Sequence, residues 1–162
     1  MTETLYSKIL GTARERGLVY GMSSGYSRQQ NNSDWWIGAQ VSIKNAPALF
    51  DIIVTELKAV QDGFLLEEDI SAAKQNALGR FQQSGQTVAG TAIGYSYRYF
   101  FDEIIDDYYK VPENISAVTK DDITKVMKAL FKQNIWGFGC LGSCDPKLLK
   151  ELNNKISALW KP

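Results

Sequence analysis

The chain has 162 residues, with 18 basic and 18 acidic side chains and a formal net charge of zero. Its length fits one ordinary domain, and the balanced charge excludes the basic footprint of a nucleic-acid-binding protein. No apolar run reaches the about 18 residues that would cross a membrane. The start, Met1 to Tyr6, lacks the basic and apolar regions of a signal peptide. These features favour a cytoplasmic domain, on the condition that the start is not truncated.

The sequence contains no histidine, which excludes every catalytic mechanism and zinc site that needs an imidazole from this chain. Its two cysteines, Cys140 and Cys144, are four residues apart. Without histidine they do not make a zinc ligand set. Packed or bystander thiols are the favoured interpretation, and a disulfide or a functional pair are the alternatives. We therefore predict no catalytic residue, metal ligand or cofactor site in this chain.

The first part of the chain predicts a helix followed by a hairpin. The helix covers the first seventeen residues and ends at Gly17. An extended segment from Leu18 to Tyr26 and a polar loop over 27–34 follow. Apolar and polar residues then alternate from Trp35 to Lys44, which is the clearest strand signal in the chain. The two extended segments predict a long antiparallel hairpin with one buried face.

Helices dominate the middle of the chain. Asn45 is the expected N-cap of a helix that ends at Gly63, and a further helix is predicted from Leu66 to about Gly85. The aromatic-rich stretch 87–109 is also predicted to be helical. Its aromatic side chains suggest a core or a partner-facing surface, because no basic groove accompanies them.

Four acidic residues near the end of that stretch could suggest a cation site, but a solvated helix face is favoured because the oxygen-rich loop spacing is missing. They are Asp102, Glu103, Asp106 and Asp107.

The last third of the chain predicts a helix, a strand and a final helix. Thr119 and Asp122 resemble a capping box that opens the first helix, and Asn134 to Gly142 is predicted to be a third strand. Asp145 and Pro146 open the last helix as its N-cap and first residue. Three strands and five or six helices predict an α+β domain with two layers, a mainly antiparallel sheet covered by helices. Three strands are few for so many helices, which indicates an incomplete sheet.

Five sequence pieces, in order and covering nearly the whole chain, resemble the pitrilysin/insulinase zinc peptidases and mitochondrial processing peptidases, the inverzincins. Ala13 to Ser24 resembles their R-E-x-R-G-L-x-Y-x-x-S-S stretch. The other pieces are the helix Leu5–Ile9, the helix start Asn45–Pro47, the acidic helix start 67–74 after a glycine, and the V-T-x-E-D-V-like segment Val118–Ile123. The resemblance implies one processing-peptidase-like metallohydrolase domain over residues 1–162.

In that family, homologous domains form a clamshell in which one half carries the zinc-binding H-x-x-E-H motif and the other half helps to hold the substrate. Because this chain has no histidine, the resemblance implies the non-catalytic, C-terminal-type half. It would hold a peptide substrate for a homologous zinc-bearing domain or subunit, with zinc only in that partner. Alone, it is expected to bind no zinc tightly and to cleave no peptide.

The resemblance also supplies two candidate substrate-binding residues. The family's substrate-binding tyrosine falls on Tyr20. Its arginine, seven residues earlier, falls on Ala13, with Arg14 beside it. Arg14 is therefore the less direct match, and an arginine placed at position 13 is expected to preserve or improve activity.

The missing arginine favours an alternative function, a catalytically dead structural or assembly module of the same family. An autonomous enzyme that uses its own carboxylates is a third, disfavoured interpretation. Family domains also begin with a strand and a helix that have no counterpart before Leu5. We therefore expect a fragment or a naturally shortened or split subunit, whose open sheet edge promotes self-association.

Overall fold

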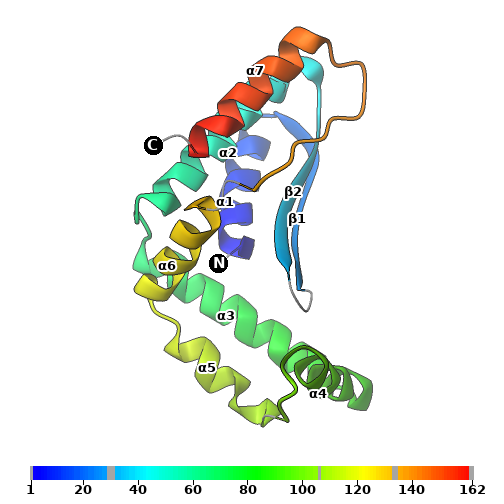
Figure 1. Cartoon of the computed structure of the whole chain (residues 1–162), viewed down its shortest axis with the longest axis vertical. Coiled ribbons are helices and arrows are strands. Elements are labelled where there is room, and N and C mark those ends of the chain that lie inside the picture. Colours follow the sequence, from blue (N-terminus) through cyan, green and yellow to red (C-terminus); the bar gives the residue numbers. More distant parts are fainter. Residues whose placement is uncertain (1, 29–31, 106, 133–134, 161–162) are drawn as a thin grey trace.

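A computed structural model describes residues 2–28, 32–105, 107–132 and 135–160 (Figure 1). Within them the fold is α+β, as predicted, with a small two-stranded antiparallel sheet. The elements, in chain order, are α1 (Thr2–Glu15), β1 (Val19–Arg28), β2 (Ser33–Val41), the 3₁₀ turn η1 (Ile43–Asn45), α2 (Ala46–Gln61), α3 (Glu67–Ser84), α4 (Val88–Asp102), η2 (Tyr108–Lys110), α5 (Val111–Ala117), α6 (Lys120–Lys132), α7 (Pro146–Ser157) and η3 (Ala158–Trp160).

The predicted hairpin is confirmed. Strands β1 and β2 pair antiparallel, with Met22 opposite Ala39 and Tyr26 opposite Trp35. Met22 and Trp35 pack partly buried against the core. The indole Nε1 of Trp35 donates a hydrogen bond to the Ser24 hydroxyl, over 3.0 Å. One face of the hairpin is therefore anchored on the helices.

Helix α2 is the centre of the core and contacts α1, α6 and α7. Its apolar residues recur at the spacing of one helix face, and six of them are buried: Ala46, Leu49, Ile52, Ile53, Leu57 and Val60. Leu5, Ile9 and Ala13 of α1 complete the contact from one side. The Gln61 amide of α2 also donates to the carbonyl of Leu159 in η3, over 3.3 Å.

Helices α3, α4 and α5 form an arm that extends away from α2 and α7 (Figure 1). Lys8 of α1 and Asp69 of α3 form an ion pair of 2.6 Å near the base of this arm. Farther out, the rings of Phe81 and Tyr108 lie 4.6 Å apart. Gly94 is required beside them, because a Cβ at this position would lie 2.5 Å from the Tyr108 ring.

Two predictions of secondary structure are wrong. The third strand predicted from Asn134 to Gly142 is absent from the described residues 135–142, and Asn134 lies outside the described part of the chain. A strand needs a hydrogen-bonded neighbour, and none is found there in the described residues. The helix predicted over 87–109 ends at Asp102, because Glu103 adopts the left-handed conformation with φ of 55°.

Two residues were predicted to cap helices with their side chains, Asp145 at α7 and Asn45 at α2, and only the first does so. Asp145 is an N-cap, as predicted: its carboxylate accepts from the Leu148 amide over 2.7 Å. Asn45 does not cap α2 with its side chain. Its amide instead donates to the carbonyls of Gly17 and Leu18, over 3.4 and 3.3 Å. Asn45 therefore ties the start of α2 to the turn between α1 and β1.

The predicted capping box at the start of α6 is confirmed. The backbone amide and the hydroxyl of Thr119 donate to one carboxylate oxygen of Asp122 over 2.9 and 2.6 Å, and the Asp122 amide donates back to the hydroxyl over 3.2 Å. The hydrogen bonds from the Thr119 side chain and backbone hold the pKa of Asp122 below its usual value of 3.8.

This lowered pKa predicts a pH-dependent effect of Asp122→Asn. A carboxyl whose pKa is lower in the folded state contributes stability above its unfolded pKa, and that contribution is lost as the pH falls through the folded value. We expect the variant to unfold at lower denaturant concentration than the native chain at neutral pH, with the difference shrinking below about pH 3.8. Asp121→Asn, which leaves the Thr119 contacts in place, is the control, and an equal loss in both variants would contradict the prediction.

Candidate functional site

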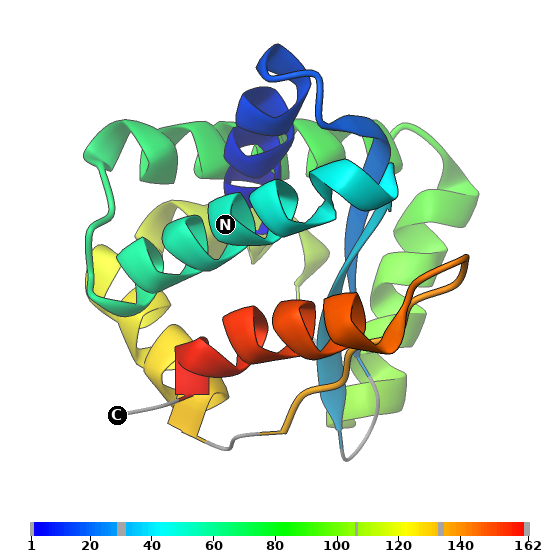
Figure 2. The same cartoon turned by 90° about the horizontal axis from the view of Figure 1, so that it is seen from above.

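A groove of about 720 Å³ lies between the hairpin and the C-terminal part of the chain. One wall is β2, of which every residue from Trp35 to Val41 lines the groove. The other is the segment Ile135–Leu141, continued by 142–144. Apolar residues of α2, α6 and α7 form the floor. Figures 1 and 2 show the segment after α6, in orange, passing β2 on its way to α7.

Both walls have unpaired backbone in the described part of the chain. Strand β2 pairs with β1 along one edge only. The segment Ile135–Leu141 is held by alternate side chains instead of by a strand. Trp136 stacks on Trp160 with ring centres 5.1 Å apart, and Phe138 packs edge-on against Phe50 at 5.3 Å. Ile135 and Leu141 remain exposed. The groove thus combines apolar side chains with free peptide groups on two sides.

Tyr20 lies at the mouth of this groove. The register of the hairpin shifts between Val19 and Gly21, which makes Tyr20 the extra residue of a β-bulge. Bulges redirect side chains and occur next to functional sites. Tyr20 lines the groove and keeps 82% of its surface exposed. Its phenol can therefore donate a hydrogen bond to a molecule in the groove.

The second candidate, Arg14, is not brought to the same place. It is exposed in the last turn of α1 and is not among the residues that line the groove with Tyr20. Ala13, its neighbour, has 0% exposure and belongs to the core. The burial of position 13 does not support the expectation that an arginine there preserves or improves activity, because a side chain at this position has no access to the groove or to solvent.

Sequence reasoning did not find the groove itself. Its walls are formed by segments about a hundred residues apart, and their proximity depends on how α6 and α7 pack on α2. The available signal was the small number of predicted strands for so many helices. That count predicted an incomplete sheet but not where the gap would lie.

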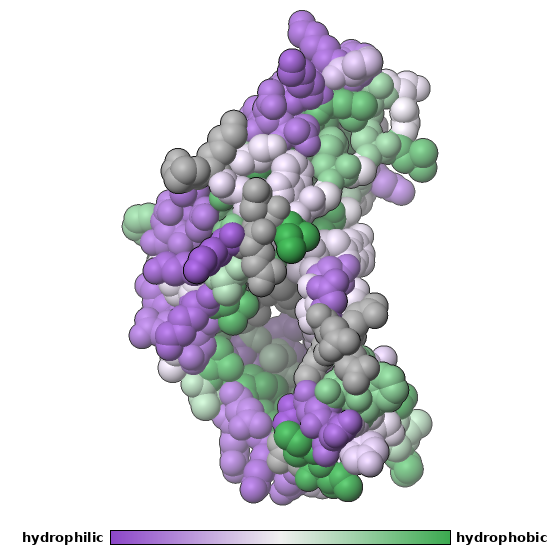
Figure 3. Space-filling model, in the orientation of Figure 1, coloured by the Kyte–Doolittle hydropathy of each residue, from purple (hydrophilic) through white to green (hydrophobic). Residues whose placement is uncertain are grey.

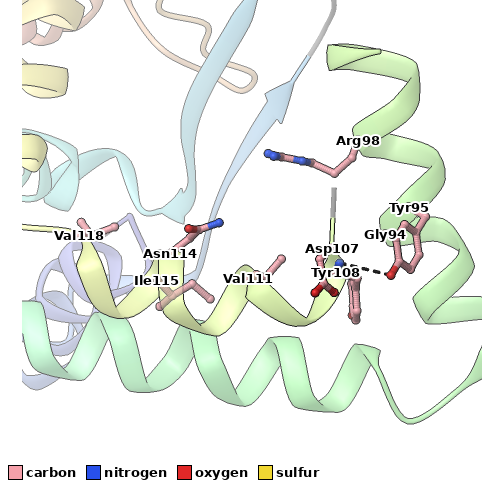
Figure 4. Close-up of a pocket in the computed structure, with 9 residues that line it drawn as sticks. All are labelled: Gly94, Tyr95, Arg98, Asp107, Tyr108, Val111, Asn114, Ile115 and Val118. Carbon is pink, nitrogen blue, oxygen red and sulfur yellow. Dashed lines mark hydrogen bonds between the residues drawn. The ribbon is translucent and has the colours of Figure 1, made fainter. Parts of the chain in front are cut away.

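A second, smaller pocket of about 290 Å³ lies between α4 and α5 (Figure 4). The Tyr95 hydroxyl accepts a hydrogen bond from the Tyr108 amide over 3.3 Å at one side of the pocket. Arg98 extends over it and pairs with Asp102 at 3.7 Å. Hydrophobic residues of this arm reach the surface around α4 (Figure 3), among them Ile93 and Phe100. The aromatic stretch therefore combines internal packing with an apolar surface.

The acidic residues at the end of α4 and directly after it do not form a metal site within the described residues. Asp102 pairs with Arg98, and Asp107 accepts from the Tyr109 amide over 3.0 Å to open η2. Asp106 lies outside the described residues. Residues 2–28, 32–105, 107–132 and 135–160 contain no group of three or more potential metal ligands. No helix among them has both the length and the apolar character needed to cross a membrane.

Comparisons with known proteins give a match in structure only. Neither protein-family models nor curated proteins match the sequence. Among solved structures, the chain is similar to one described as a predicted insulinase family protease from Yersinia pestis, with a TM-score of 0.62 and 13% identity. The match covers 99% of this chain and 37% of that chain. The chain therefore has the fold of part of an insulinase-family protease.

The burial of Ala13 and the exposure of Arg14 predict effects of very different size on stability when these two neighbours are replaced. Ala13→Arg places a charge in the core between α1 and α2, where desolvation costs several kcal/mol, so we expect a loss of more than about 3 kcal/mol in the free energy of unfolding. Arg14→Ala is expected to change it by less than about 0.5 kcal/mol. Denaturant unfolding of both variants measures this, and a stably folded Ala13→Arg would contradict the assignment of position 13 to the core.

Proposed function

We propose that the chain is the non-catalytic half of an inverzincin-type zinc metallopeptidase, which encloses and binds a peptide substrate for a zinc-bearing partner domain. The observation that carries the proposal is the exposure of Tyr20 on a bulge at the mouth of the groove. The insulinase-protease fold and the family-like stretch around Tyr20 support it.

The role of Tyr20 would be electrostatic. A phenol carried by a paired strand can donate to a substrate carbonyl or to the oxygen that gains charge in the transition state. Such a preorganised donor is most effective when it needs no reorganisation during the reaction. The hairpin supplies this rigidity, because its register continues on both sides of the bulge.

The groove suits an extended peptide. An unpaired strand edge offers main-chain donors and acceptors to a peptide that adds as a further strand, and adjoining apolar pockets take alternate side chains. In this chain β2 supplies the edge, and the apolar floor includes Leu49 and Leu152.

Zinc and the general base would come from the partner. The matched structure is much longer than this chain, which spans 37% of it, so a further domain fits the proposal. The chain would then be inactive alone, and its substrate would be cleaved only in the assembled enzyme. This extends the expectation drawn from the absence of histidine.

A catalytically dead structural or assembly module is the second candidate. It is favoured by the separation of Arg14 from the groove and by the burial of Ala13, where the family has arginine. The apolar surface around α4 and the open edge of β2 would then serve assembly, including pairing with a second copy.

Replacement of Tyr20 by phenylalanine distinguishes the two functions. In a complex reconstituted with a half that carries H-x-x-E-H, we expect Tyr20→Phe to lower kcat by about 10²–10³ if the phenol acts on the transition state, as for the strongest oxyanion donors. Stability should change little, because the side chain is 82% exposed. Peptide hydrolysis and thermal unfolding are measured on the same samples.

Tyr26→Phe is the matched control. Tyr26 lies on the same strand and is 74% exposed, but it does not line the groove with Tyr20. We expect it to leave kcat unchanged. If Tyr20→Phe is as silent as Tyr26→Phe in an active complex, Tyr20 is only a strand residue, and an assembled complex without any hydrolysis would favour the structural module.

A further inference from the structure

The two cysteines of the chain lie together at the rim of the groove. Their Sγ atoms are 2.6 Å apart, and both residues are free thiols that line the groove. Cys140 is exposed and Cys144 is half-buried. This placement differs from the packed or bystander thiols that the sequence favoured, because the two sulfur atoms contact each other while one of them remains open to solvent.

The backbone holds both thiols in place. Phe138 anchors the chain just before Cys140 by its contact with Phe50. Asp145, directly after Cys144, caps α7. Between the two cysteines, Gly142 has a φ of 143°, a conformation that residues with a side chain rarely adopt. A Cβ at Gly142 would meet no atom within 4 Å, so glycine is required here for conformation and not for space.

We propose that Cys140 and Cys144 form a reversible intramolecular disulfide when the protein meets a low-molecular-weight disulfide such as oxidised glutathione. One cysteine thiolate attacks the oxidant, forms a mixed disulfide and releases one glutathione thiolate. The second cysteine then attacks the sulfur of the first and releases the other glutathione. The two cysteines lose two protons and two electrons, and the oxidant takes them up as two thiols.

The order of the two steps follows from exposure. Cys140 is open to an oxidant, whereas Cys144 is half-buried. The hydrogen bond between the two thiols raises the pKa of Cys144 above its usual value of 9.0. This direction favours the thiol form of Cys144 and agrees with its half-buried position, which assigns it the role of the resolving thiol.

The disulfide would fix one wall of the groove. The segment Ile135–Leu141 has no strand neighbour among the described residues, so its position depends on the contacts of Trp136 and Phe138. A bond from Cys140 to Cys144 ties the end of this segment to the start of α7. Oxidation would thus restrict the movement of the segment Ile135–Leu141 relative to α7, and this effect does not depend on which molecule the groove binds.

The test is a titration of the full reduced chain with mixtures of oxidised and reduced glutathione, followed by alkylation and intact-mass analysis. We expect the two thiols to disappear together, with a final mass lower by two hydrogen atoms, no lasting glutathione adduct and no dependence on protein concentration. Cys144→Ser should instead keep one stable glutathione adduct on Cys140. Persistent free thiols, adducts on both cysteines or disulfide-linked dimers in the native chain would overturn the proposal.

A pair of loop variants tests the role of the backbone. Gly142→Val disfavours the backbone conformation that brings the thiols together and should lower the equilibrium constant for disulfide formation by about tenfold. Ser143→Ala, in the same loop, should leave it unchanged. Circular dichroism checks that both variants are folded. Equal oxidation of the Gly142→Val and Ser143→Ala variants would overturn the assignment of Gly142.

Discussion

The burial of one apolar face of α2 is the constraint on which the rest of the structure depends. Its five large buried side chains, from Leu49 to Val60, each contribute about 1.5–3 kcal/mol relative to exposure. Since the net stability of a typical domain is only about 5–15 kcal/mol, the loss of even one or two of these contributions would be a large fraction of it. Helices α1, α6 and α7 pack on this face, and α1 in turn carries the hairpin. Any change that tilts α2 would therefore move both walls of the groove.

The groove is a consequence of this arrangement. Helices α6 and α7 both pack on α2, and the segment Ile135–Leu141 between them lies across the groove from β2. The Trp136–Trp160 and Phe138–Phe50 contacts hold this segment. These contacts fix side chains but leave peptide groups unpaired. The open strand edge, the apolar floor and the redox-sensitive rim proposed above thus follow from one packing constraint.

The parts of the fold that were predictable from sequence are those fixed by local patterns. Apolar spacing located α1, α2 and α3, the capping box at Thr119 located the start of α6, and strict alternation located β2, whereas the short helix α5 was not predicted. Features set by distant neighbours were not predictable. Asn45 bonds to the preceding turn instead of capping α2, and the segment after α6 has the pattern of a strand without a neighbour to pair with.

In the candidate site, too, local sequence patterns pointed to some features, whereas others depend on distant neighbours. The family-like stretch pointed to Tyr20, but its bulge depends on the register against Gln40 and Val41, which alternation alone does not reveal. Arg14 and Ala13 are adjacent in sequence, yet one is exposed and the other fully buried. Helical spacing places Ala13 on the face of Leu5 and Ile9, so this difference was readable from the sequence, but the match to the family's arginine position outweighed that signal.

The central claim is that β2 and the segment Ile135–Leu141 form the two open walls of a peptide-binding groove. Hydrogen exchange of their backbone amides tests this most directly, in the isolated chain and in a complex with a zinc-bearing half and a non-cleavable peptide. The account predicts rapid exchange at the outer edge of β2 and along Ile135–Leu141 in the isolated monomer, beside slow exchange in α2, and protection of both walls together in the complex. Slow exchange of both walls in the isolated monomer, or no change in the complex, would contradict it.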